Sequence, residues 1–124
     1  MPSSSLERSP KRVPEYVFYR DVAAVDTLAT LKEKHGINMA GYDYAHIQVV
    51  PVAGNPTVTV MWWSAGANKF AQEHTAISKT GVGDGVPYEF TVECRGRIMI
   101  VAVTTMTAGS AKIYVGGYGR RHPE

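Results

Sequence analysis

Four histidines and one cysteine are the side chains of this 124-residue chain best suited to metal binding or acid–base chemistry. They are His35, His46, Cys94, His74 and His122. No two of them stand at the close spacing that zinc sites use. His46 and His74 fall in strand patterns, where an ordinary hydrogen-bonded histidine is the usual case, and Glu73 would face away from His74 in a strand. The sequence therefore predicts no catalytic residue, no metal site and no cofactor.

One further segment superficially resembles a catalytic motif. GVGDGVP, residues 81–87, is glycine-rich like a phosphate-binding loop, but no helix follows whose N-terminus could bind an anion. No serine stands in the G-x-S-x-G turn of hydrolases. Cys94 alternates with Tyr88, Phe90 and Val92, so we expect it to be a buried structural thiol. The chain is not expected to be an enzyme.

Composition limits the classes of partner. The formal net charge of +2 is too small to indicate nucleic-acid binding. No apolar run approaches the roughly 20 residues of a membrane span, and the first sixteen residues contain no hydrophobic signal segment. A single cysteine excludes an intramolecular disulfide and fits assembly in a reducing cytosol.

The first fifteen residues differ from the rest. They are polar and contain Pro2, Pro10 and Pro14, which predicts an extended N-terminal arm over 1–15 that stays outside any sheet. Residues 16–124 then form one domain. Basic side chains gather at both ends of the chain, at Arg8, Lys11, Arg12, Arg120 and Arg121. They are either solvated termini or arms that dock on an acidic neighbour.

Alternating apolar residues predict strands through most of the domain. We expect them over residues 16–20, 42–52, 57–63, 69–78, 88–96, 97–106 and 111–117. Residues 21–36 fit either one short helix near 22–34 or a strand and loop. Short strands separated by turns every eight to twelve residues predict an all-β fold, an antiparallel β-sandwich with jelly-roll connections.

The segment VMWWSA places two tryptophans side by side in a strand, so they face opposite sides. Trp62 continues the β-branched row of Val58 and Val60 and is expected in the core. Trp63 then shares the outer face with Met61 and two threonines. Such a face would be covered by the chain's own arm or loop, or by another subunit. A third possibility is a sugar ring stacked on an aromatic platform, to which other aromatic side chains could contribute, namely Tyr42, Tyr44, Tyr114 and Tyr118.

The chain resembles the small jelly-roll accessory proteins of tailed-phage particles, especially head decoration (cement) proteins. The resemblance is one of pattern over roughly residues 42–119. The segments that carry it are YAHIQVVPV, TVTVMWWSAGANKF, VPYEFTVECRGRIMIVAV and AKIYVGGYG.

The resemblance implies a structural virion protein, made in the host cytoplasm, that binds the capsid surface as a dimer or trimer and stabilises the shell. Its partners would be the major capsid protein or other virion subunits, with no nucleic acid, membrane or cofactor involved. The residues that we expect to dock are Arg8, Lys11, Arg12, Tyr16, Phe18, Met61 and Trp63. The alternatives are a carbohydrate-binding β-sandwich module and a tail, neck or fibre subunit.

Overall fold

A computed structural model describes residues 17–107 and 109–119, except the side chains of residues 17 and 18. Nine strands and two short 3-10 turns make up this part of the chain. The strands are β1 (Val17–Val22), β2 (Ile37–Asn38), β3 (Tyr44–Pro51), β4 (Thr57–Ser64), β5 (Lys69–Ala71), β6 (Ile77–Thr80), β7 (Tyr88–Glu93), β8 (Ile98–Thr105) and β9 (Ala111–Tyr118). The turns are η2 (Leu28–Thr30) and η3 (Glu33–His35).

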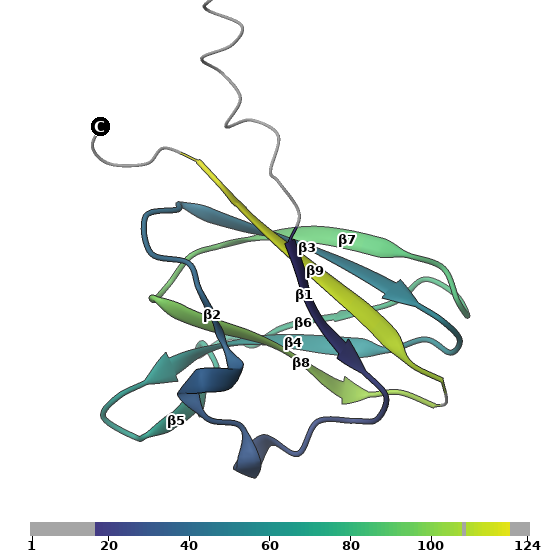
Figure 1. The fold of residues 1–124 in the computed structure, drawn as a ribbon, viewed down its shortest axis with the longest axis horizontal. Helices are drawn as coiled ribbons and strands as arrows, with labels where there is room; N and C mark the ends of the chain where they lie inside the picture. The colour runs from purple at the N-terminus through teal and green to yellow at the C-terminus, as the bar shows by residue number, and fades with distance from the viewer. Residues whose placement is uncertain (1–16, 108, 120–124) are drawn as a thin grey trace, which may run out of the picture.

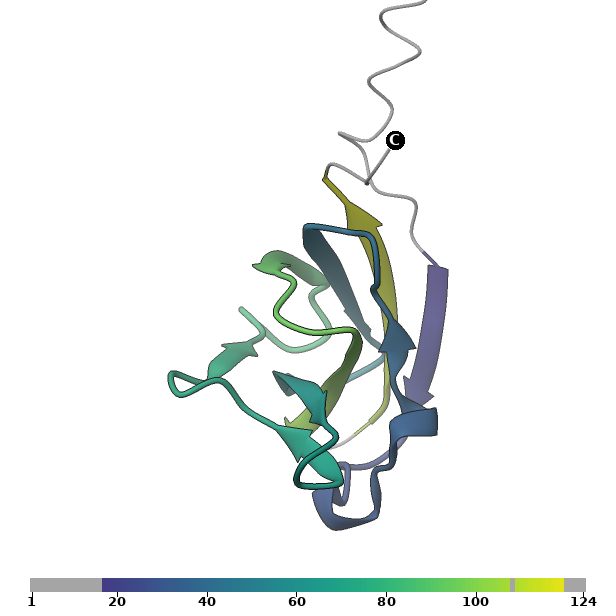
Figure 2. The same ribbon diagram turned by 90° about the vertical axis from the view of Figure 1, so that its left-hand side faces the viewer.

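The strands form two antiparallel sheets that face each other (Figures 1 and 2). The four-stranded sheet has the order β1-β9-β3-β7. The five-stranded sheet has the order β2-β8-β4-β5, with β6 also paired to β4. Because the chain crosses between the sheets after β1, β2 and β3 and again after β6, β7 and β8, the topology is that of a jelly roll. The predicted fold class is confirmed.

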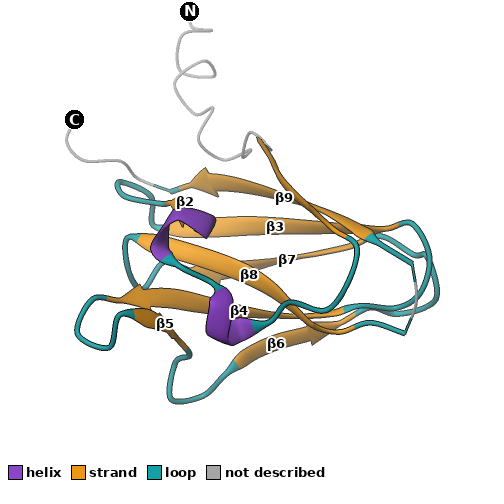
Figure 3. Cartoon of the chain, turned by 60° about the horizontal axis from the view of Figure 1, so that its bottom comes forward, coloured by secondary structure: helices purple, strands orange, loops and turns teal. Residues whose placement is uncertain are grey.

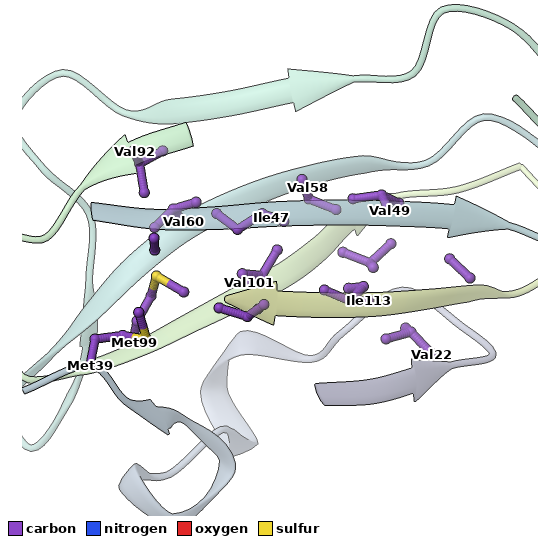
Figure 4. Packing of buried hydrophobic residues seen from close by; sticks show 14 of the residues in the cluster. Val22, Met39, Ile47, Val49, Val58, Val60, Val92, Met99, Val101 and Ile113 are labelled. Carbon is purple, nitrogen blue, oxygen red and sulfur yellow. The ribbon is translucent and has the colours of Figure 1, made fainter. Parts of the chain in front are cut away.

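The core lies between the two sheets and consists of inward-facing side chains from alternate strand positions. Figure 4 shows Ile47 and Val49 of β3 facing Val58 and Val60 of β4, with Val101 of β8 beside them. All five side chains are fully buried. Strand β8 is apolar on both faces, as predicted, because a second apolar layer lies on its outer side.

The two tryptophans of β4 separate as expected. Trp62 is 7% exposed and belongs to the core between the sheets. Trp63 points to the outer side of the five-stranded sheet, where it is half-buried and packs edge-on against Phe70 with ring centroids 5.1 Å apart. On the same outer row, the hydroxyl of Thr59 is 2.8 Å from that of Ser78.

The outer side of the five-stranded sheet is covered by residues 23–36, here called the strap. Figure 3 shows its two 3-10 turns lying across β8 and β4. Leu31 of the strap packs with Met61, Ile100 and Ala102 in a second apolar cluster. The short helix considered for this segment is not formed. Only one strap side chain, Leu31, is buried on the sheet, and an α-helix would need a continuous apolar stripe.

A partly buried ion pair between Arg20 and Asp26 holds the strap against the sandwich. A bulge in β1 between Phe18 and Arg20 shifts the pairing with β9, so Arg20 comes to lie opposite the buried Ile113. The Arg20 guanidinium donates to both carboxylate oxygens of Asp26, at 3.0 and 2.6 Å, and to the carbonyl of Val101 at 3.0 Å. Asp26 in turn accepts a hydrogen bond from the backbone N–H of Val103 at 2.7 Å. The pair thereby satisfies backbone groups on the edge of β8.

The strand expected over 69–78 is interrupted. β5 and β6 both pair with the same edge of β4, but residues 72–76 leave the sheet between them. If β5 continued in the register that sets Ala71 opposite Trp62, Glu73 would lie opposite Val60, on the side that faces the core. Ile77 takes that position instead and packs against the core. Because residues 72–76 leave the sheet, the Glu73 carboxylate is not placed on the core-facing side, where burial would be costly.

Candidate functional site

Most of the predicted docking residues fall outside what the structure describes. Arg8, Lys11, Arg12 and Tyr16, together with the side chain of Phe18, are in this group. Met61 is described, and its part in a subunit contact stays a prediction. It is 3% exposed, and Leu31 and Phe70 of the same chain cover it. Trp63 is partly exposed and remains a candidate contact residue.

The groups considered for chemistry in the sequence are not brought together. Cys94 packs against the core, and burial, with smaller contributions from nearby Asp43 and Glu93, raises the pKa of its thiol to about 11. A thiol with that pKa is almost entirely protonated at neutral pH and is a poor nucleophile. His74 is exposed in the loop between β5 and β6, so its expected strand position is wrong. Residues 81–87 form a loop between strands, as predicted.

The outer face of the four-stranded sheet carries a group of aromatic and polar side chains. We call it the tyrosine face and define it by Tyr44, His46, Gln48, Glu89, Thr91, Tyr114 and Tyr118. The register of β3 with β7 and β9 makes these residues direct cross-strand neighbours. The rings of Tyr44 and Tyr118 lie 5.7 Å apart at an interplanar angle of 31°. This face combines large aromatic surfaces with hydrogen-bonding groups, as recognition surfaces do.

His46 is held in one orientation at the centre of the tyrosine face. Its Nε2 is 2.6 Å from Oε1 of Glu89, and its Nδ1 is 2.6 Å from the hydroxyl of Thr91. Because the Glu89 carboxylate can only accept, the neutral ring carries its proton on Nε2 and donates it to Glu89. Nδ1 then accepts a hydrogen bond from the Thr91 hydroxyl. The prediction of an ordinary hydrogen-bonded histidine is confirmed. Sequence reasoning missed Glu89 and Thr91 because only the β3–β7 register identifies them as neighbours.

Both ends of the described chain lie at one end of the tyrosine face. β1 begins at Val17, which pairs with Val115 of β9, and β9 ends at Tyr118, which pairs with Tyr44. The segments 1–16 and 120–124 are therefore joined to the same end of the same sheet. The sequence places the basic side chains Arg8, Lys11, Arg12, Arg120 and Arg121 in those segments.

A groove lies on the opposite side of the molecule, between the strap and β5. Its volume is about 340 Å³, at the lower end of the range of about 300–1,000 Å³ for small-molecule sites. The side chains of Leu31, Met61 and Phe70 line it together with Leu28, and Lys32 and Lys69 stand among the polar lining residues. Among the described residues, no acidic side chain lines it. It could accept an apolar group accompanied by a negative charge.

Within residues 17–107 and 109–119, no three His, Cys, Asp or Glu side chains are grouped closely enough to hold a metal ion. Among the same residues, no helix is long and apolar enough to cross a membrane. Comparison with known proteins found no matching family model, no matching curated protein and no matching solved structure.

Proposed function

We propose that this chain is a structural subunit of a virus particle, of the type that decorates the heads of tailed phages. It docks on the major capsid protein or another virion subunit through the tyrosine face and the two terminal segments. The proposal is supported at the level of architecture by the jelly roll, which is frequent in viral capsid and lectin domains. Because one fold serves many functions, the specific support has to come from the surface.

The observation that carries the proposal is the position of the two chain ends beside Tyr44 and Tyr118. The terminal segments hold the whole charge excess of the chain, because acidic and basic side chains balance between residues 17 and 119. Five basic residues stand there against Glu7, Glu15 and Glu124. Basic segments attached at the end of an aromatic face suit an acidic partner surface, since charge complementarity speeds encounter and fixes orientation.

The test is co-sedimentation of the full chain with mature particles of the virus that encodes it. The variant Arg120→Ala/Arg121→Ala should bind more weakly and with less dependence on salt. The matched control, Lys34→Ala/Lys79→Ala, removes the same charge from the five-stranded side and should bind like the parent chain. A parent chain that never sediments with particles would overturn the proposal.

Carbohydrate binding is the second candidate, favoured by the exposed ring of Tyr44 beside the hydrogen-bonding groups of His46 and Glu89. Sugars bind by stacking on such a ring while their hydroxyls pair with polar neighbours. Titration with a panel of saccharides, using the parent chain and Tyr44→Ala, separates the two functions. Saturable binding lost in the variant supports glycan recognition, and a chain that binds particles but no saccharide supports the virion role.

A further inference from the structure

Exposed apolar side chains gather at the end of the sandwich opposite the β4–β5 hairpin. Val82 is 81% exposed, Val52 is 65% exposed and Val86 is 42% exposed. Hydrogen bonds join the loops that carry them, since the N–H of Gly85 donates to the carbonyl of Gly54 at 2.7 Å. We call Val52, Val82, Asp84 and Val86 the tip. Three large apolar residues exposed together are unusual on a solvated surface and indicate a contact site.

The tip and the groove are complementary in chemistry and lie at opposite ends of β4. Strand β4 begins at Thr57, just after the turn that the tip loop contacts, and ends at Ser64, where the hairpin to β5 and the groove begin. Within the described part of the chain, the groove offers an apolar floor, Lys32 and Lys69, and no carboxylate. The tip offers aliphatic side chains around an exposed Asp84.

We propose that the groove binds the tip of a second copy of this chain. In that contact Val82 or Val86 enters the space over Met61 and Phe70, and Asp84 faces Lys69 and Lys32. The contact is heterologous, because each copy contributes a different surface. Head-to-tail contacts of this kind close into a ring or extend into a filament. Self-association needs no virus particle, so its test is independent of the proposed function.

The experiment is sedimentation equilibrium on the full chain over a wide concentration range. The parent chain should exceed the monomer mass as concentration rises. Asp84→Lys and Lys69→Glu each place like charges together and should raise the concentration needed for association about tenfold or more. Arg97→Glu matches the charge change of Lys69→Glu outside both surfaces and should leave association unchanged.

Two combinations of the variants test the head-to-tail geometry. An equimolar mixture of Asp84→Lys and Lys69→Glu should recover association, because the altered tip of the first variant and the altered groove of the second carry opposite charges, and the two unaltered surfaces match as in the parent chain. The double variant Asp84→Lys/Lys69→Glu restores opposite charges and should associate like the parent chain. Val82→Ser should unfold at the parent's temperature yet lose association, since this side chain is exposed in the monomer.

Three results would overturn the proposal. The first is a parent chain that stays monomeric throughout the concentration range. The second is an oligomer whose mass neither Asp84→Lys nor Lys69→Glu changes, which would locate the contact on another surface. The third is an equimolar mixture of the two single variants that remains monomeric.

Discussion

The two neighbouring tryptophans show how strongly strand geometry separates adjacent residues. Trp62 fills the space between the sheets, where Gly96 packs against its ring. Trp63, one residue later, lies on the opposite side against Phe70. Their contributions to stability should therefore differ, although their chemistry is identical.

Trp62→Ala should reduce the free energy of unfolding by about 3–5 kcal/mol, because it empties a large core position. Trp63→Ala should cost only about 1–2 kcal/mol, since its ring is already partly exposed and it loses one edge-on aromatic contact. Chemical denaturation of both variants measures the difference. Trp62→Phe is the control, because the indole Nε1 has no hydrogen-bond partner among the described residues and the smaller ring should keep much of the stability. The reverse ranking would mean that the faces of β4 are exchanged.

Two tyrosines should make the fold sensitive to alkali. Burial raises the pKa of Tyr19 and of Tyr88 to about 12, from an ordinary value of 10.0. The folded chain thus keeps phenolic protons that the unfolded chain releases near pH 10, so stability should be full below that pH and fall as pH rises toward 12. Unfolding by denaturant between pH 9 and 12 tests this. Tyr88→Phe should flatten the dependence, and an unchanged slope would contradict the assignment.

At the scale of elements, the ion pair of Arg20 and Asp26 decides whether the strap stays on the sheet. Asp26→Ala leaves a partly buried guanidinium without its carboxylate partner and the N–H of Val103 without its acceptor. We expect a loss of about 3–5 kcal/mol in unfolding free energy. Asp21→Ala is the matched control, an aspartate on β1 beside Arg20, because its pair with Lys112 is exposed and should contribute less than about 1 kcal/mol. Equal losses from both variants would contradict a special role for Asp26.

The alternation of apolar and polar residues predicted the strands that face the core. This signal is strong because shifting a strand's pairing by one residue would turn all of its apolar side chains outward. β3, β4 and β9 are examples, and the inside position of Trp62 followed from them. The strap could not be predicted, since one anchoring residue, Leu31, leaves no periodic signal. The tyrosine face also escaped prediction as a group, because cross-strand neighbours such as His46 and Glu89 depend on register. The break after Ala71 depends on which residue faces Val60, which is again a matter of register.

At the scale of the whole molecule, residues 17–107 and 109–119 form a sandwich with a continuous core of their own. Deleting Met1–Glu15 should therefore change the midpoint of thermal unfolding by no more than about 2 °C, while binding to particles weakens. Differential scanning calorimetry and co-sedimentation measure the two effects separately. A large fall in the unfolding temperature would show that the segment is part of the folded domain.

The pairing of β1 with β9 has a consequence for biosynthesis. These strands are the first and last in the described chain, and β9 also separates β1 from β3 within the sheet. While the ribosome is still adding residues before Ala111, β1 has no neighbour to pair with and the inner faces of β3 and β8 are only partly covered. The four-stranded sheet can form only after β9 has been synthesised. We therefore expect slow folding that completes after translation and benefits from chaperones.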